Sequence, residues 1–193
     1  MTIRHWIFKS EPSSYSYQDL LRDGIAEWDG VRNFQARNFL RDDIQIDDRV
    51  LFYHSNTQPP AVIGTAIVSR SGYPDHTALD PEARHSDPKS TAEKPIWYMV
   101  DIKAEEQFRM PVTLPEMRGN PNLENMMLLR KGMRLSVQPV TPKEFLTICA
   151  MGQKTHNTSY LWGSQTFDSW RNALTACVQG ITTMKSVSWK TQP

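Results

Sequence analysis

Planar polar side chains crowd behind one tryptophan in the stretch WDGVRNFQARNFL, residues 28–40. Arg32, Asn33, Gln35 and Arg37 all follow Trp28 closely. An indole face can stack on a flat heteroaromatic ring, while amides and guanidiniums can bond the polar edge of that ring. A buried core has no use for so many unpaired polar groups. The stretch therefore predicts a site that binds something flat, and a nucleobase fits that description.

Two further segments place polar groups where strands are expected to end. FKSEP (8–12) follows an apolar strand with an ammonium, a hydroxyl and a carboxylate, and FYHS (52–55) closes a second strand. Strand ends and the loops beyond them commonly carry binding groups. A stacking face is expected from Trp28 or Tyr53. The groups expected to bond a base edge are Lys9, Ser10, Asn33, Gln35, His54 and Arg134.

Each of these residues also has a purely structural interpretation. A tryptophan beside a turn is often an indole that covers the core, so Trp28 could belong to the packing. His54 could satisfy a backbone carbonyl, and Arg32 could pair with Asp29 across the turn. The argument for a pocket rests on the recurrence of such groups at strand ends and helix starts.

The elements that must hold these groups follow a mixed pattern. Apolar runs rich in β-branched and aromatic residues predict strands at 5–9, 49–55, 61–70, 95–108 and 134–140. Capping signals predict helices at 17–23, from residue 33 onward, within 114–132 and at 142–151. Strands with short helices between them indicate an α+β fold, with a curved sheet or a small open barrel.

The chain divides at about residue 150. Residues 1–150 have the pattern of one folded domain, whereas residues 151–193 are rich in Thr, Ser, Gln and Asn and show little periodicity. We expect this second part to be a poorly ordered extension without a function of its own. A docked helix near residues 169–178 is the alternative.

Composition limits the classes of function. The formal net charge is +1, so no global basic field indicates nucleic acid. The two cysteines, Cys149 and Cys177, form no CxxC motif, which suits a reducing compartment and argues against zinc. No apolar run is long enough to cross a membrane, and the N-terminus lacks a signal-peptide core. We expect a soluble intracellular protein without a metal, cofactor or membrane partner.

Six segments resemble the EVE domain family in order and in spacing, across about residues 3–149. They are WIFKSEP, EWDGVRNFQARNFLR, DDRVLFYHSNTQPPAVIG, YPDHTALDPE, DPKSTAEKPIWYMVDI and LLRKGMRLSVQPVTPKEF. The resemblance implies the PUA-like fold, a curved mixed sheet or pseudo-barrel with peripheral helices, related to YTH and ASCH domains. It also implies that the protein binds nucleic acid carrying a modified base and performs no reaction.

Carried over by position, the resemblance completes the expected site. The modified-base pocket would comprise Lys9, Ser10, Glu11, Trp28, Asn33, Gln35, Tyr53, His54, Ser55, Arg134, Leu135 and Ser136. Apart from the resemblance, affinity for the nucleic-acid backbone has to come from a local patch of cations, expected at Arg32, Arg37, Arg41, Arg130 and Lys131. The implied ligand is a modified cytosine flipped out of DNA, with methyladenine in RNA as an alternative. A monomer is expected, cytoplasmic and nucleoid-associated in a bacterium or nuclear in a eukaryote.

Two other classes stay open at this stage. ASCH-type relatives include small amide hydrolases, in which Lys9 and Glu11 could act as base and orienter and His54 as acid. Lys9 and Glu11 could instead form a surface ion pair of little energetic weight. A third possibility is a module that binds a small molecule or a protein in the same cavity.

The same reasoning predicts how the opening stretch and one long loop are arranged. Trp28 should face the pocket with its ring exposed to ligand, while Phe39 and Leu40 should face the core. The Pro- and Asp-rich loop at residues 72–95 should either lie on the nucleic acid or cover the edge of the sheet.

Overall fold

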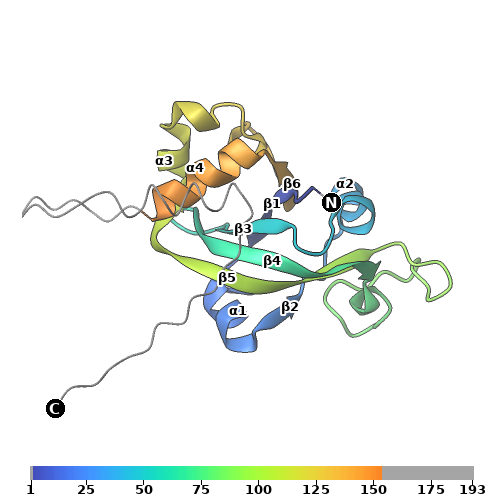
Figure 1. The fold of residues 1–193 in the computed structure, drawn as a ribbon. Coiled ribbons are helices and arrows are strands. Elements are labelled where there is room, and N and C mark those ends of the chain that lie inside the picture. Colours follow the sequence, from blue (N-terminus) through green and yellow to red (C-terminus); the bar gives the residue numbers. More distant parts are fainter. Residues whose placement is uncertain (1, 154–193) are drawn as a thin grey trace, which may run out of the picture. The chain divides into compact units, whose positions relative to one another are not determined.

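One mixed sheet organises the part of the chain that the computed structural model describes, residues 2–153 (Figure 1). Its strand order is β2-β5-β4-β3-β1-β6. The strands are β1 (His5–Ser10), β2 (Ile25–Glu27), β3 (Arg49–His54), β4 (Ala61–Pro74), β5 (Tyr98–Thr113) and β6 (Val137–Val140). The α+β class is confirmed, and the mixed sheet is not closed into a barrel.

The central strands β1 and β3 run parallel, and the other paired strands run antiparallel. The register aligns His5 with Arg49 at one end and Ser10 with His54 at the other. The carboxyl ends of β1 and β3 therefore lie next to each other at the same end of the sheet. Beyond it, the Ser55 amide still donates to the Ser10 carbonyl (2.8 Å). This pairing places the FKSEP and FYHS segments side by side.

Short helices connect the strands. The α-helices are α1 (Tyr17–Asp23), α2 (Phe34–Asn38), α3 (Leu114–Arg118) and α4 (Pro142–Gly152). A single π-helical turn, η1 (Phe39–Asp43), continues α2, and 3-10 turns cover η2 (His76–Ala78), η3 (Pro121–Leu123) and η4 (Met127–Leu129). The expected capping boxes at the starts of α1 and α4 are both present.

Strand alternation divides the core into two clusters. Phe8 and Phe52 belong to one cluster, while Ile7 and Leu51, their neighbours along the strands, belong to the other. Successive side chains on a strand point to opposite faces, which produces this separation. Figure 1 shows α3 and α4 together on one side of the sheet and α1 on the other. Leu40 is fully buried in the first cluster, as predicted.

Two features differ from the sequence-based expectation. The short strand β2 was not predicted, because three residues, IAE, give too little alternation to detect. Strands β4 and β5 also run longer than expected, with several register shifts that let the pair curve. Residues 154–193 lie outside the described residues, so the predicted poorly ordered extension stays a prediction.

Candidate functional site

Two cavities open beside the shared end of β1 and β3. The Trp28 cavity encloses about 550 Å³, and the Tyr53 cavity about 410 Å³. The Trp28 cavity is lined by Lys9, Ser10, Ser13, Ser14, Tyr15, Glu27, Trp28, Asp29, Gly30, Val31, Arg32, Arg84, His85 and Ser136. The Tyr53 cavity is lined by Lys9, Tyr53, Leu114, Arg118, Leu128, Leu129, Arg130, Lys131, Gly132, Met133 and Arg134. Lys9 is common to both.

Trp28 lines its cavity but is mostly buried. Only 8% of the residue is exposed, and its ring packs against Phe8 (5.1 Å between centroids) and edge-on against Phe52 (5.5 Å). Its amide donates to the Val100 carbonyl (2.7 Å), which continues the β2–β5 pairing and holds the residue against the core. The expectation of a ring largely open to ligand is therefore wrong.

The end of β1 supplies the polar floor of the Trp28 cavity. The Ser10 hydroxyl donates to the Tyr15 carbonyl (2.6 Å), so its oxygen remains able to accept a hydrogen bond from a ligand. Lys9 Nζ donates to the Met133 carbonyl (3.2 Å), and burial lowers the pKa of its ammonium. Within residues 2–153 no ion pair joins Lys9 to Glu11.

The opposite wall is held by a buried carboxylate. Asp75 accepts hydrogen bonds from Arg32 Nη1 (2.7 Å) and from the Gly30 amide (3.1 Å). Burial alone would raise the pKa of Asp75, but hydrogen bonds from Thr77, Arg32 and Gly30 hold it below its usual range. The structure thus pairs Arg32 with Asp75, not with Asp29 as the sequence suggested, because Asp75 enters from a distant loop.

That loop reaches the cavity through His85 and Arg84. Arg32 Nε donates to the His85 carbonyl (2.7 Å), which ties the loop to the turn after Trp28. Gly30 has φ 68°, and a Cβ there would lie 2.7 Å from His85 Nδ1, so a larger residue would be strained and would push the imidazole away. The 72–95 segment therefore contributes directly to a cavity wall.

Asp29 is the remaining acidic group on this wall. Desolvation at the cavity, together with the negative charge of Asp75, raises the pKa of the Asp29 carboxyl. A carboxylate there can accept a hydrogen bond from a ligand amino group, and a carboxyl group can also donate one. Together with Ser10 and Lys9, Asp29 gives this cavity both hydrogen-bond donors and acceptors.

Several predicted pocket residues have other roles. Asn33 accepts from the amides of Gln35 and Ala36 and caps α2. His54 Nε2 accepts from the Tyr17 amide (3.1 Å), and Ser55 Oγ donates to the Ser10 carbonyl (3.2 Å). The predicted residues that line neither cavity are Glu11, Asn33, Gln35, His54, Ser55 and Leu135.

The segment after Gly132 distributes its side chains between the cavities. Arg134 lines the Tyr53 cavity, Leu135 is buried in the core, and Ser136 lines the Trp28 cavity. The Ser136 carbonyl accepts from the Lys9 amide (2.9 Å), which holds this segment beside β1. One short stretch therefore separates the two cavities and contributes to both.

The cations expected to meet a nucleic-acid backbone fall into two groups. Arg37 donates to the Ile96 carbonyl (2.5 Å), and Arg41 pairs with Asp42 (2.7 Å). Arg32 is held by Asp75, whereas Arg130 and Lys131 are exposed and form no ion pair with any residue in 2–153. Arg130 and Lys131 are therefore freer to bind a ligand than Arg32, Arg37 and Arg41.

Sequence reasoning missed several residues that line these cavities, and Arg84, His85 and Arg118 are the basic ones among them. Arg84 and His85 lie in a loop, and an arginine next to a histidine was the available signal. Arg118 stands at the end of α3, far along the chain from Lys9, and nothing local indicated that it would meet Tyr53. Its positive charge partly offsets the burial that raises the pKa of Tyr53.

The groups suggested for hydrolysis do not converge. Lys9 lines both cavities, but Glu11 and His54 line neither. Burial lowers the pKa of His54, and its Nε2 already accepts a hydrogen bond from the backbone, which suits a neutral structural imidazole. Across residues 2–153 no group of three potential ligands could hold a metal ion, and no helix there is long and apolar enough to span a membrane.

An unclosed mixed sheet with short helices agrees with the PUA-like fold that the resemblance to EVE domains implies. Residues 4–151 match the EVE domain model, and the chain belongs to the EVE domain family.

Its relatives include human thymocyte nuclear protein 1, which is 36% identical over 170 residues, 78% of this chain and 74% of that protein. A Pseudomonas putida protein of known crystal structure shares 43% sequence identity with this chain, and the two structures superpose with a TM-score of 0.74. The match covers 77% of this chain and 99% of the other. Human thymocyte nuclear protein 1 also has a crystal structure in complex with DNA containing 5-methylcytosine, and the protein in it shares 35% sequence identity with this chain. Its TM-score is 0.73, covering 79% of this chain and 99% of the other.

Proposed function

We propose that this protein is a non-catalytic DNA-binding protein that recognises a modified cytosine, rotated out of the duplex into the Trp28 cavity. The observation that carries the proposal is the human relative bound to DNA containing 5-methylcytosine, which shares 35% identity over 79% of this chain. The Trp28 cavity supports it, since about 550 Å³ falls within the usual range for small-ligand sites.

Recognition in this cavity depends more on polar groups than on stacking. Flipping a base costs a few kcal/mol, and stacking on a freely exposed aromatic ring returns about 1–3 kcal/mol. Trp28 is only 8% exposed, so it offers a base a small apolar contact and not a full stacking face. Ser10, Lys9 and Asp29 supply the complementary hydrogen bonds that would identify a cytosine edge.

Affinity for the backbone has to come from local cations, because the whole chain is nearly neutral. Arg130 and Lys131 are exposed near the mouth of the Tyr53 cavity, and Arg84 lines the Trp28 cavity. Such a distribution suits modest, salt-sensitive binding to any duplex, with preference set by the cavity. The protein would work where DNA resides, in the nucleus of a eukaryote or the nucleoid of a bacterium.

The proposal is tested by titrating the protein with duplexes that differ at one base. Three fluorescent ligands are compared by anisotropy: a duplex with one 5-methylcytosine, the same duplex unmodified, and single-stranded RNA with one N6-methyladenine. A 2-aminopurine next to the modified cytosine in the same strand should brighten when that cytosine leaves the stack. We expect preference for the modified duplex, with brightening.

A matched pair of variants assigns that preference to the cavity. Asp29→Asn should lower the ratio of modified to unmodified affinity by about tenfold, through one altered hydrogen-bonding group. Asp47→Asn, an equal charge change at an exposed turn that lines neither cavity, should leave the ratio unchanged. Preference for the RNA, or conversion of the modified nucleoside detected by mass spectrometry, would overturn the proposal.

A further inference from the structure

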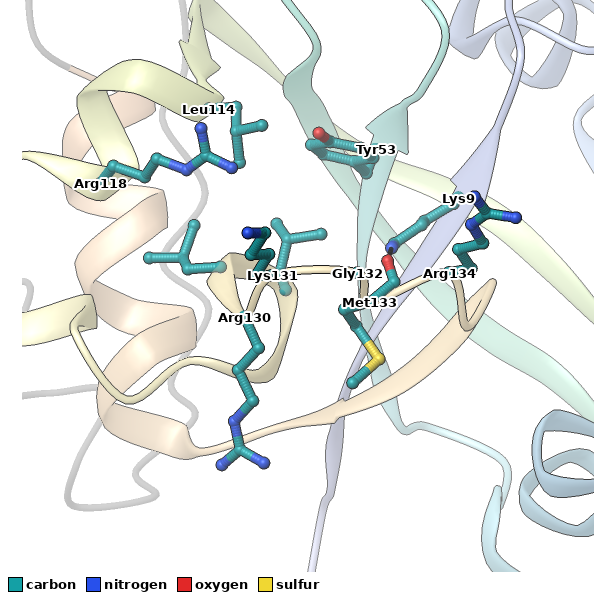
Figure 2. A pocket seen from close by; sticks show the side chains of 11 residues that line it. Lys9, Tyr53, Leu114, Arg118, Arg130, Lys131, Gly132, Met133 and Arg134 are labelled. Atoms are coloured by element: carbon teal, nitrogen blue, oxygen red, sulfur yellow. Dashed lines mark hydrogen bonds between the residues drawn. The ribbon is translucent and has the colours of Figure 1, made fainter.

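The Tyr53 cavity has a composition unlike that of its neighbour. It lies between the shared end of β1 and β3 on one side and α3 with the 127–134 segment on the other. Figure 2 shows the side chains of Lys9, Lys131 and Arg118 arranged around Tyr53. Leu114, Leu128 and Leu129 complete an apolar floor. A cationic rim over an apolar floor suits a ligand that is anionic at one end only.

The rim has five cations and no carboxylate. They are Lys9, Arg118, Arg130, Lys131 and Arg134. Within residues 2–153 none of the five is joined to a carboxylate in an ion pair. By contrast, Arg32 in the neighbouring cavity is neutralised by Asp75. The Tyr53 cavity thus keeps its positive charge available for a ligand.

The Arg118 guanidinium, with the Lys9 and Lys131 ammonium groups beside it, favours phosphate as that ligand (Figure 2). A guanidinium presents a planar pair of donors that matches two phosphate oxygens, and such charge-assisted bonds are stronger than neutral ones. About 410 Å³ exceeds the needs of a bare phosphate and leaves room for an attached sugar against the leucine floor. A phosphate linked to a deoxyribose satisfies both parts of the cavity.

Lys9 connects this cavity to the Trp28 cavity. Its Nζ donates one hydrogen bond to the Met133 carbonyl (3.2 Å). An ammonium has three N–H donors, so two remain for a ligand. Arg134 and Ser136 lie on the two sides of the same short segment. A nucleotide whose base entered the Trp28 cavity would carry its linking phosphate toward Lys9.

We infer that the Tyr53 cavity binds a phosphate of the DNA strand that carries the modified cytosine, at the linkage next to that nucleotide. The inference rests on the proposed function. It adds a specific backbone position, gripped by Arg118 and Lys131 with Lys9, to the recognition of the base.

The test couples a neutral backbone linkage to a cavity variant. A single methylphosphonate replaces each phosphate flanking the 5-methylcytosine in turn, and affinity is measured by anisotropy. At one flanking position the neutral linkage should weaken binding to the natural sequence about tenfold or more, as loss of a charge-assisted contact does. In the double variant Arg118→Gln, Lys131→Gln the same linkage should cost less than about twofold, because two of its three partners are gone and only Lys9 remains.

The control removes two charges elsewhere. Arg109→Gln with Lys143→Gln changes exposed residues on β5 and α4 that line neither cavity. In this control variant the methylphosphonate should still weaken DNA binding about tenfold. Both double variants alter exposed side chains, so their melting temperatures should match that of the natural sequence, and a thermal scan checks this.

The outcomes separate the inference from the function on which it rests. If the natural sequence prefers the modified duplex but no flanking linkage depends on Arg118 and Lys131, the inference is wrong and the proposed function stands. If the modified and unmodified duplexes bind equally, the proposed function fails first. Inorganic phosphate is titrated separately while the Gly132 amide is followed by NMR; saturable binding there without linkage coupling would assign the cavity to a free phosphate ligand and overturn the backbone assignment.

Discussion

Arg32 Nη1 lies 2.7 Å from Oδ2 of Asp75, a carboxylate with no exposed surface. The pair joins the turn after Trp28 to the start of the loop that carries His85. It fixes one wall of the Trp28 cavity from a distance of more than forty positions along the chain. The cavity therefore depends on this pair more than on any local turn.

Breaking the pair should destabilise the domain. Asp75→Asn keeps the shape but removes the charge, leaving the Arg32 guanidinium, which is 21% exposed, without its counter-ion. We expect a loss of about 3 kcal/mol in the free energy of unfolding at neutral pH, the lower end for a broken buried pair because Arg32 retains some solvent. Urea unfolding of the two proteins measures the difference.

The pH dependence gives an independent check of the same pair. The folded state holds the pKa of Asp75 below its unfolded value of about 3.9. Its stabilisation is present above that value and is lost as the pH falls through the lower, folded pKa. The difference in unfolding free energy between the natural sequence and Asp75→Asn should therefore become smaller below about pH 4. A gap that stays constant down to pH 2 would contradict the assignment.

Trp28 should behave as a structural residue that also touches the ligand. Trp28→Ala empties a site against Phe8 and Phe52, and we expect a loss of about 3–5 kcal/mol in unfolding free energy. Trp28→Phe keeps an aromatic ring in place and should fold, with a reduced preference for the modified duplex. Leu40→Ala is the control: it should destabilise by about 2–5 kcal/mol and leave the preference of the folded fraction unchanged.

His54 should matter for stability and not for any reaction. His54→Ala leaves the Tyr17 amide without its acceptor, at a cost of about 1–3 kcal/mol. His54→Gln retains an acceptor and should recover part of that loss. Because burial lowers the folded pKa of His54, the contribution is present above about pH 6.5 and is lost as the pH falls through the folded value. Equal stability of the two variants across this range would argue against the bond.

Lys9 should report the arrival of a phosphate. Burial lowers its pKa in the free protein. A phosphate placed in the Tyr53 cavity would favour the charged ammonium and raise that pKa again. Isotope-labelled lysine followed by NMR through a pH titration, with and without the modified duplex, measures the change. An identical titration in both states would show that no anion approaches Nζ.

Local signals in the sequence were sufficient for much of the fold. Ser16 with Asp19 and Thr141 with Glu144 mark the starts of α1 and α4, because a capping box needs only neighbouring residues. Of the two residues predicted to face the core, Leu40 is fully buried and Phe39 is partly buried against the same cluster. Helix and strand periodicity therefore carried the fold class and most element positions.

The cavities depend on contacts that no local pattern carries. Asp75 meets Arg32 only because β4 extends to Pro74 and delivers the loop there. Arg118 reaches Tyr53 only after α3 has packed, through Met117, into the second core cluster. Trp28 was expected to face ligand, but its backbone pairing with β5 turned the indole inward. Residue types at strand ends indicated where the two cavities lie and could not specify their walls.

The position of Lys9 on both cavities has a consequence for how such a domain diversifies. A substitution at Lys9 changes the lining of both cavities at once. The His85 loop and Asp29 border only the Trp28 cavity, and Arg118 borders only the Tyr53 cavity. A change in the His85 loop therefore reshapes the Trp28 cavity and leaves the Tyr53 cavity and strand β1 as they are.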